Sequence, residues 1–247
     1  MFVKNDEDYL LMAQVYVDDI VFGATIDDRA IEFSKEMKKE FEMSMVGEFT
    51  FFLGLQVKQK KEGIFISQEK YARNIVKKFG LDSKKHASTP ISLSTKLNVD
   101  SSGVKLSPTL YRSIIGSLLY FTASRPNIAF SVGVCARYQA APKESHLTAM
   151  KRIIRYINGT PDYGLWYSKD SNACLVGYSD ADWAGSVDDR KSTSGGCFYL
   201  GNNLVSWISK KQNFVSLSTA EAEYIAARSC CTQLIWMKKL LHDYGIP

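Results

Sequence analysis

The spacing of the hydrophobic residues changes twice along this chain of 247 residues. Near the start, apolar residues form short β-rich runs such as 13–22, and the runs 49–59 and 63–67 are also strand-like. Residues 109–157 hold three stretches with helical spacing instead, and the last of them, 144–157, carries an apolar stripe of Leu147, Met150, Ile153, Ile154 and Ile157. Residues 165–208 return to short strand-like runs, and a long helix is expected at about 218–243. Apolar residues make up 45% of the chain, which is ample for packed cores. The pattern predicts an α+β fold.

The composition excludes several other classes of protein. No apolar stretch reaches the roughly 18 residues that a transmembrane helix needs, so we expect no membrane partner. Residues 1–8 lack the layout of a signal peptide and are too acidic for a transit peptide. The 5 cysteines are odd in number and contain no Cys-x-x-Cys pair, which disfavours a disulfide framework or a zinc site. We expect an intracellular chain from a reducing compartment.

The net charge of +5 conceals an uneven distribution along the chain. Residues 1–57 carry 5 basic and 12 acidic side chains, whereas residues 58–172 carry 19 basic and 7 acidic ones. Residues 173–247 are balanced, with 7 of each. A basic middle between carboxylate-bearing ends predicts a polyanion that is held by the middle. The alternative is that the lysines and arginines only solvate helix surfaces.

Asp18 and Asp19 stand together between two hydrophobic runs, as in a hairpin with two carboxylates at its turn. The two negative carboxylates repel each other, and a bound divalent cation would remove the energetic cost of this repulsion. Mg²⁺ favours oxygen ligands and is usually held by one or two carboxylates together with substrate phosphates. The alternative is an Asp-Asp turn that simply faces water, because aspartate is common in turns.

Several motifs follow one another in a fixed order. Tyr-Val-Asp-Asp at 16–19 resembles the catalytic hairpin of reverse transcriptases, and Phe52, Leu53 and Gly54 resemble their primer grip. The series continues as in copia-type (pseudoviral) retrotransposon polyproteins, with matching stretches at 88–90, 111–116, 125–128 and 158–160. The resemblance covers nearly the whole chain. One departure is Asn127, where the family often has Asp, and either residue would cap the following helix.

This resemblance implies that Asp18 is the firmer Mg²⁺ ligand and Asp19 the weaker one, since neighbours on a strand point to opposite faces. It also implies that basic residues of the middle track a primer–template backbone or an RNA–DNA hybrid, because phosphate contacts position a duplex without reading its sequence. These residues are Lys70, Arg73, Lys77, Lys78, Lys151, Arg152 and Arg155. For any one of them, a solvated helix face is the alternative.

The C-terminal third closely resembles the ribonuclease H domain of the same elements. The matching stretches are 177–185, 190–195, 206–207 and 221–224. On this resemblance Asp180, from a strand, and Glu223, from a helix, are catalytic metal ligands for two Mg²⁺ ions. The neighbouring acids have structural alternatives, because Asp182 can be a turn residue and Glu221 can complement the helix N-terminus. The four tryptophans are expected in the core.

The resemblance divides the chain into three ranges. Residues 1–67 correspond to the C-terminal part of a reverse transcriptase palm with its primer grip, 68–160 to a helical thumb and connection region, and 161–247 to a partial ribonuclease H fold with a three-strand meander and a long helix. In the family, each metal site has one further Asp. That of the polymerase site lies upstream of the position of residue 16, and that of the ribonuclease H site lies downstream of the position of residue 247. We therefore expect Mg²⁺ binding and catalysis to be weak or absent in this chain alone.

Three functions are compatible with these features. The chain can be a fragment of an active RNA-directed DNA polymerase and ribonuclease H, completed by the missing polyprotein segments. It can be a catalytically inactive remnant of a copia-type element, and the incomplete metal sites favour this interpretation. It can also be a non-enzymatic nucleic-acid-binding remnant that uses the basic middle.

Overall fold

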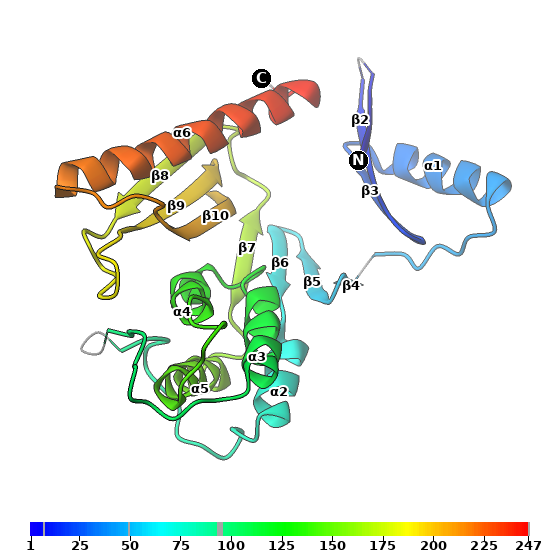
Figure 1. Cartoon of the computed structure of the whole chain (residues 1–247). Helices are drawn as coiled ribbons and strands as arrows, with labels where there is room; N and C mark the ends of the chain where they lie inside the picture. The colour runs from blue at the N-terminus through cyan, green and yellow to red at the C-terminus, as the bar shows by residue number, and fades with distance from the viewer. Residues whose placement is uncertain (7, 49, 93–95, 247) are drawn as a thin grey trace. The chain divides into compact units, whose positions relative to one another are not determined.

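The computed structural model describes residues 1–246 except 7, 49 and 93–95. In this part, ten strands form three antiparallel sheets, and six helices connect or cover them (Figure 1). The predicted mixture of helix and strand is thus confirmed. Two compact units are present, Met1–Phe49 with Trp236–Pro247, and Thr50–Ile235.

The first unit contains a three-stranded sheet and a helix. Its strands lie in the order β1-β2-β3. They are β1 (Phe2–Asn5), β2 (Leu10–Tyr16) and β3 (Asp19–Ala24). Helix α1 (Asp27–Glu40) follows, and Phe33 on this helix meets Phe22 on β3 with ring centroids 5.0 Å apart. The predicted hairpin around the aspartate pair is confirmed.

The second unit opens with a four-stranded sheet in the order β4-β5-β6-β7. Its strands are β4 (Phe51–Phe52), β5 (Leu55–Lys60), β6 (Gly63–Ser67) and β7 (Gly164–Ser168). The sequence predicts one strand over 49–59, of which Phe49 lies outside the described residues. A turn divides the rest, because Leu53 and Gly54 both have positive φ angles, 48° and 77°. β7 comes from far along the chain, so this sheet joins distant segments.

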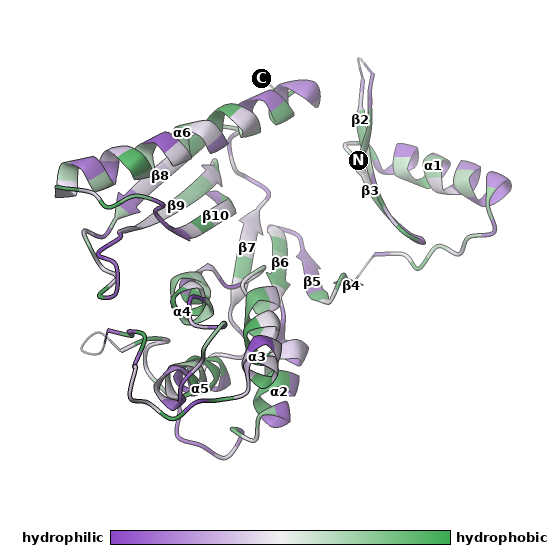
Figure 2. Ribbon diagram, viewed as in Figure 1, coloured by the Kyte–Doolittle hydropathy of each residue, from purple (hydrophilic) through white to green (hydrophobic). Residues whose placement is uncertain are grey.

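Four helices pack together beside this sheet. They are α2 (Glu69–Lys78), α3 (Pro108–Phe121), α4 (Pro126–Ala136) and α5 (Glu144–Asn158). Hydrophilic (purple) and hydrophobic (green) residues both occur along α2 and α5, as expected for amphipathic helices (Figure 2). The predicted apolar stripe of α5 is confirmed, since Met150, Ile153, Ile154 and Ile157 are buried in the main core. Burial of this shared face stabilises the helices.

The last sheet is a three-stranded meander in the order β10-β9-β8, which leaves β8 at an edge. Its strands are β8 (Leu175–Ala181), β9 (Thr193–Leu200) and β10 (Asn203–Lys211). Helix α6 (Thr219–Asp243) covers one face, where a Cβ on Gly177 would touch Cys230 and Leu234. Helix α4 lies on the other face, where Arg137 Nη2 donates to Thr193 Oγ1 at 2.8 Å (Figure 1).

Candidate functional site

The first aspartate pair lies at the tip of the β2–β3 hairpin. Tyr16 pairs with Asp19, so Val17 and Asp18 form the turn. Val17 has a φ of 53°, a left-handed conformation that a β-branched residue rarely adopts. Backbone strain of this kind is concentrated at functional sites and is a reason to look for function in this turn. Both aspartates are exposed, so a ligand can reach them.

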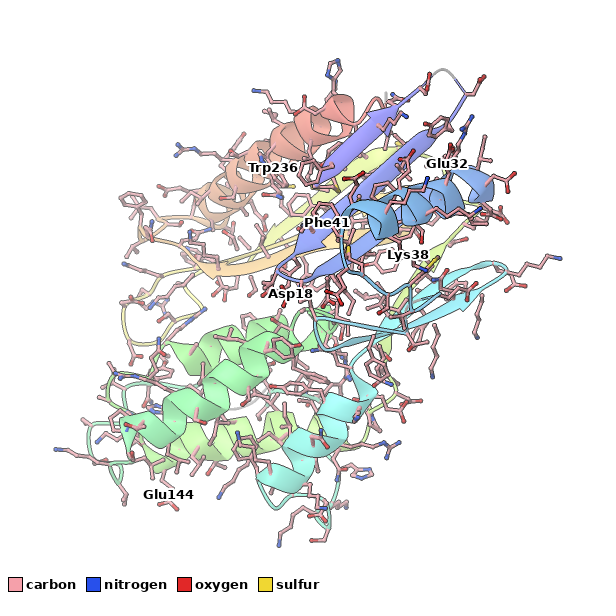
Figure 3. All side chains as sticks on the ribbon, turned by 90° about the vertical axis from the view of Figure 1, so that its right-hand side faces the viewer. Asp18, Glu32, Lys38, Phe41, Glu144 and Trp236 are labelled. Carbon is pink, nitrogen blue, oxygen red and sulfur yellow. The ribbon has the colours of Figure 1, made fainter. Side chains whose placement is uncertain are left out.

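A cavity of about 830 Å³ lies beside this turn within the first unit. Asp18 lines it together with Phe41 and Glu42, which follow α1, and its other walls are mostly apolar. Figure 3 shows Asp18 at the end of the hairpin and Phe41 at the end of α1. The second aspartate is not among the lining residues. The two carboxylates therefore have different surroundings.

The predicted primer-grip residues lie at the β4–β5 turn, with Phe52 at the end of β4 and Leu53 and Gly54 in the turn itself. Tyr120, on α3, donates a hydrogen bond from its hydroxyl to the carbonyl oxygen of Leu53. A Cβ on Gly54 would overlap the same hydroxyl, so only glycine fits beneath it. The ring of Tyr120 in turn packs edge-on against Tyr71 at 4.9 Å. Tyr120 therefore holds the turn against the helices, a contact that spacing along the chain could not reveal.

The predicted basic residues of α2 are exposed. Lys70, Arg73, Lys77 and Lys78 lie on the solvent side of this helix, whose opposite side is buried in the core. Arg73 pairs with Glu69 one turn earlier, with Nη2 and Oε1 2.8 Å apart. Exposed pairs of this kind are weak and can be exchanged for phosphate. The α2 surface thus offers cations that can contact a polyanion.

The predicted basic residues of α5 have two kinds of environment. Lys151 is exposed, but Arg152 donates to Thr89 O at 3.1 Å and to Thr89 Oγ1 at 2.8 Å. Arg155 has a buried Nε atom that lacks a hydrogen-bond partner in the described part of the chain. Arg152 therefore holds the linker, the segment between α2 and α3 that contains Thr89, against α5. Lys151 is the most accessible cation of the three.

The second carboxylate pair lies around the edge strand β8. Glu223 Oε1 accepts a hydrogen bond from the backbone N–H of Ala181, at 3.2 Å. Gly177 faces α6, so Asp180, three residues later, points to the opposite face. There it lines a cavity of about 450 Å³ between the sheet and α4, whose walls include Gly195 and Gly196. The two carboxylates approach the same strand edge from opposite sides.

The neighbouring acids have structural roles. Asp182 Oδ1 accepts a hydrogen bond from the N–H of Thr193 at 2.5 Å, which closes the loop between β8 and β9. Glu221 Oε2 accepts from the N–H of Leu217 at 2.7 Å, and Ser218 Oγ accepts from the N–H of Glu221 at 3.1 Å. Ser218 and Glu221 thus satisfy backbone donors at the start of α6, as in a capping box.

This capping arrangement makes a direct prediction about stability. Glu221→Ala is expected to lower the free energy of unfolding by about 0.5–1 kcal/mol, because it leaves the N–H of Leu217 without this partner. Glu223→Gln retains an oxygen that can accept from Ala181 and should change the stability much less. Urea unfolding followed by circular dichroism measures both variants. Equal losses would show that Glu221 is not a cap.

The loop that follows Asp182 is fixed at two further places. Burial alone would raise the pKa of Asp189, but hydrogen bonds from Lys211 and Ser186 outweigh it and lower the pKa to about 2. Lys211 Nζ lies 2.7 Å from Asp189 Oδ2. The adjacent Asp188 accepts from the N–H of Val99 at 2.9 Å. These contacts connect the loop to β10 and to the linker.

The donor atoms at both carboxylate pairs fit Mg²⁺, which prefers oxygen ligands. Across the described ranges, no group of three or more His, Cys, Asp or Glu side chains lies close enough together to hold a metal ion. Each place thus brings two carboxylates at most within the described residues. Within the same described residues, no helix combines the length and apolar character that crossing a membrane requires.

The tryptophans differ from the prediction of a common core position. Trp166 is 41% exposed, Trp183 51% and Trp236 56%. Trp183 directs its indole N–H to the carbonyl oxygen of Ser216 at 3.2 Å. The size of these side chains predicted burial, but Trp166 on β7, Trp183 after β8 and Trp236 on α6 are all exposed.

Comparison with known proteins identifies relatives along the full chain. Residues 1–93 match the family model "Reverse transcriptase (RNA-dependent DNA polymerase)". The chain is 36% identical to the "Retrovirus-related Pol polyprotein from transposon RE2" of Arabidopsis thaliana over 247 residues, all of this chain and 17% of that polyprotein. It is 34% identical over 255 residues to the corresponding polyprotein from transposon TNT 1-94 of Nicotiana tabacum, 99% of this chain and 19% of that protein.

A shorter relative matches over nearly its whole length. The "Uncharacterized mitochondrial protein AtMg00810" of Arabidopsis thaliana is 37% identical over 229 residues, which is 92% of this chain and 93% of that protein. The chain therefore spans less than a fifth of the two polyproteins but almost all of this relative. No solved structure matches the chain significantly.

Proposed function

Because this chain belongs to the family of copia-type retrotransposon Pol polyproteins, we propose that it joins the C-terminal part of a reverse transcriptase to the N-terminal part of a ribonuclease H. The observation that carries the proposal is the continuous match to Pol polyproteins over 247 residues. In this proposal residues 1–67 are palm and primer grip, 68–160 are thumb and connection, and 161–247 are nuclease. The antiparallel meander with its long helix supports the last assignment.

In the polymerase part, Asp18 and Asp19 would hold Mg²⁺ at the strained turn of the β2–β3 hairpin. When bound, Mg²⁺ supplies charge that stabilises the attacking and leaving oxygens of phosphoryl transfer. The β4–β5 turn, with Phe52, Leu53 and Gly54, would contact the primer strand. The hydrogen bond from Tyr120 supports this role, since a turn that is fixed before binding loses less entropy on contact.

In the nuclease part, Asp180 and Glu223 would hold Mg²⁺ for cleavage of RNA in an RNA–DNA hybrid. Glu223 is favoured over Glu221 because Glu221 is already used as a helix cap, whereas Glu223 reaches the backbone next to Asp180. Asp180 is favoured over Asp182 for the same reason, since the Asp182 carboxylate closes a loop. The cavity beside Asp180 leaves that carboxylate accessible to a substrate.

We further propose that this chain alone is not catalytically competent. Two Mg²⁺ ions bring four positive charges, and two carboxylates offset only half of them. No larger acidic group is assembled within the described residues. Positioning for in-line attack would then be poor, and such positioning contributes much of the rate in these reactions. Acidic residues from other segments of the polyprotein would complete both sites.

If this chain alone is not catalytically competent, the purified chain is expected to show no Mg²⁺-dependent primer extension and no cleavage of an RNA–DNA hybrid. Gel assays with labelled primer–template and labelled hybrid measure both reactions. Asp18→Asn and Asp180→Asn serve as controls, because any contaminating activity would survive them. Activity that the wild-type chain shows and either variant loses would overturn this proposal and assign catalysis to the chain itself.

A second function, non-enzymatic binding of nucleic acid, is favoured by the exposed cations of the middle region. Lys70, Arg73, Lys77, Lys78 and Lys151 all lie at the surface. A chain without catalysis would still bind a duplex through them. Binding without cleavage supports either a polymerase fragment or a binding remnant. Restoration of activity on adding the missing polyprotein segments would distinguish the fragment.

A further inference from the structure

A buried glutamine lies between the meander and the start of α6. Gln212 follows β10 directly and is 5% exposed. Its Nε2 donates to Ser194 Oγ at 3.0 Å and to the carbonyl oxygen of Ala222 at 2.9 Å. Its Oε1 accepts from Ser216 Oγ at 3.0 Å, and its backbone N–H donates to Ser192 O at 2.8 Å. Both amide hydrogens of the side chain therefore have partners.

The two partners of Nε2 lie next to the candidate carboxylates. Ser194 on β9 is the register partner of Ala181 on β8, the residue after Asp180. Ala222 directly precedes Glu223 on α6. Glu223 in turn accepts a hydrogen bond from the N–H of Ala181. These contacts therefore close a circuit. β8 pairs with β9, Ser194 on β9 accepts a hydrogen bond from Gln212, and Gln212 also donates to α6. Glu223 on α6 then accepts a hydrogen bond from Ala181 on β8.

We propose that Gln212 is a positioning residue that sets the place of Glu223 relative to Asp180. One amide nitrogen joins β9, the neighbour of the strand that carries Asp180, to the helix that carries Glu223, and both of its bonds are shielded from water. Buried hydrogen bonds are costly to lose because the abandoned acceptor stays desolvated. Ligand-orienting residues outside the first coordination shell often matter nearly as much as the ligands. This inference rests on the proposed nuclease function.

Other residues of the same connection support this role. Ser216 holds the Gln212 side-chain oxygen, and its carbonyl oxygen accepts the indole N–H of Trp183. Two residues later, Ser218 caps α6. The segment between β10 and α6 is thus held at Gln212, Ser216 and Ser218. This leaves the helix start little freedom to move along the strand.

The test compares Gln212→Met, which keeps the length of the side chain without its polar atoms, with Ser194→Ala, which removes one partner of Nε2. Gln59→Met is the matched control, since Gln59 is an exposed glutamine. Two NMR readouts are used, together with thermal unfolding to establish that each variant is folded. One is hydrogen exchange and the chemical shift of the Ala181 amide. The other is paramagnetic broadening by Mn²⁺ near Asp180 and Glu223.

Both Gln212→Met and Ser194→Ala are expected to shift the Ala181 amide and to speed its exchange, and to weaken Mn²⁺ binding about tenfold. Gln59→Met should change neither readout. An unchanged Ala181 amide and unchanged Mn²⁺ affinity in a folded variant would overturn the proposal. If Gln212→Met does not fold, Ser194→Ala decides. If the wild-type chain shows no broadening at Asp180 and Glu223, the proposed metal site fails, and the Ala181 amide alone decides the role of Gln212.

Discussion

Binding of an RNA–DNA duplex to this chain is expected to weaken roughly 10²- to 10³-fold when salt rises from about 50 to about 200 mM. Each phosphate that a protein cation neutralises releases condensed counterions, so affinity falls steeply with salt. Four or five exposed cations, on α2 and at Lys151, are available for such contacts. Fluorescence anisotropy with a labelled duplex at several salt concentrations measures the slope.

A matched pair of variants locates the binding surface. Lys77→Gln/Lys78→Gln removes two lysines from the last turn of α2, and Lys38→Gln/Lys39→Gln removes two from the last turn of α1. The first double variant should reduce the slope of log K against log[salt] by about 2, whereas the second should leave it unchanged. A flat salt response, or equal effects of the two variants, would contradict binding by the basic middle.

Arg125→Ala is expected to lower the free energy of unfolding by about 3–5 kcal/mol, the largest stability effect that we predict. This guanidinium is 1% exposed. Nη1 donates to Thr160 O at 2.7 Å and Nη2 to Thr160 Oγ1 at 2.8 Å, while Nε donates to Asn127 Oδ1 at 3.2 Å. Truncation would leave a cavity and several acceptors without partners.

Aromatic rings complete the environment of this arginine. The guanidinium carbon lies 5.4 Å from the ring centroid of Phe121, 5.9 Å from that of Tyr156 and 5.3 Å from that of Tyr163. Burial lowers the pKa of Arg125, but an arginine remains charged at neutral pH. The rings therefore stabilise a buried cation, and they do so across three separate segments of the chain.

The control for this prediction is Arg112→Ala, because Arg112 is exposed on α3. Its replacement should change the stability by no more than about 0.5 kcal/mol. Urea denaturation of both variants gives the comparison. Similar small losses would mean that Arg125 is not a structural residue, and its burial would then need another explanation. A large loss places Arg125 outside the cations that contact nucleic acid.

Much of the local structure was predictable because it depends on neighbouring residues. The hairpin around Asp18 and Asp19, the apolar stripe of α5 and the long C-terminal helix all follow from periods of two or 3.6 residues. The sequence did not predict the turn at Leu53 and Gly54, because the apolar run at 49–59 has the pattern of a single strand. Its left-handed backbone depends on glycine and on Tyr120, which is 67 residues away from Leu53.

The candidate sites show the same division. The resemblance indicated Asp180 and Glu223 and the sequence allowed a capping role for Glu221, but only the structure shows which backbone N–H the Glu221 carboxylate accepts from. Likewise, Arg152 and Lys151 are equivalent in the sequence, yet one is bound to the linker and the other is free to meet a phosphate. Such differences depend on which side of a helix is covered, and that is decided by packing.

By itself the sequence determined the strands and helices with a clear hydrophobic period, the charge of the middle region and the family to which the chain belongs, because each depends on short-range order or on motif order. The tertiary structure decided which polar groups are already satisfied. Gln212 stands in none of the motifs, and the motif at 125–128 does not reveal that Arg125 is buried; each is defined by hydrogen bonds to distant segments. Buried polar groups must find partners wherever the fold places them, so their roles emerge only once the chain is folded.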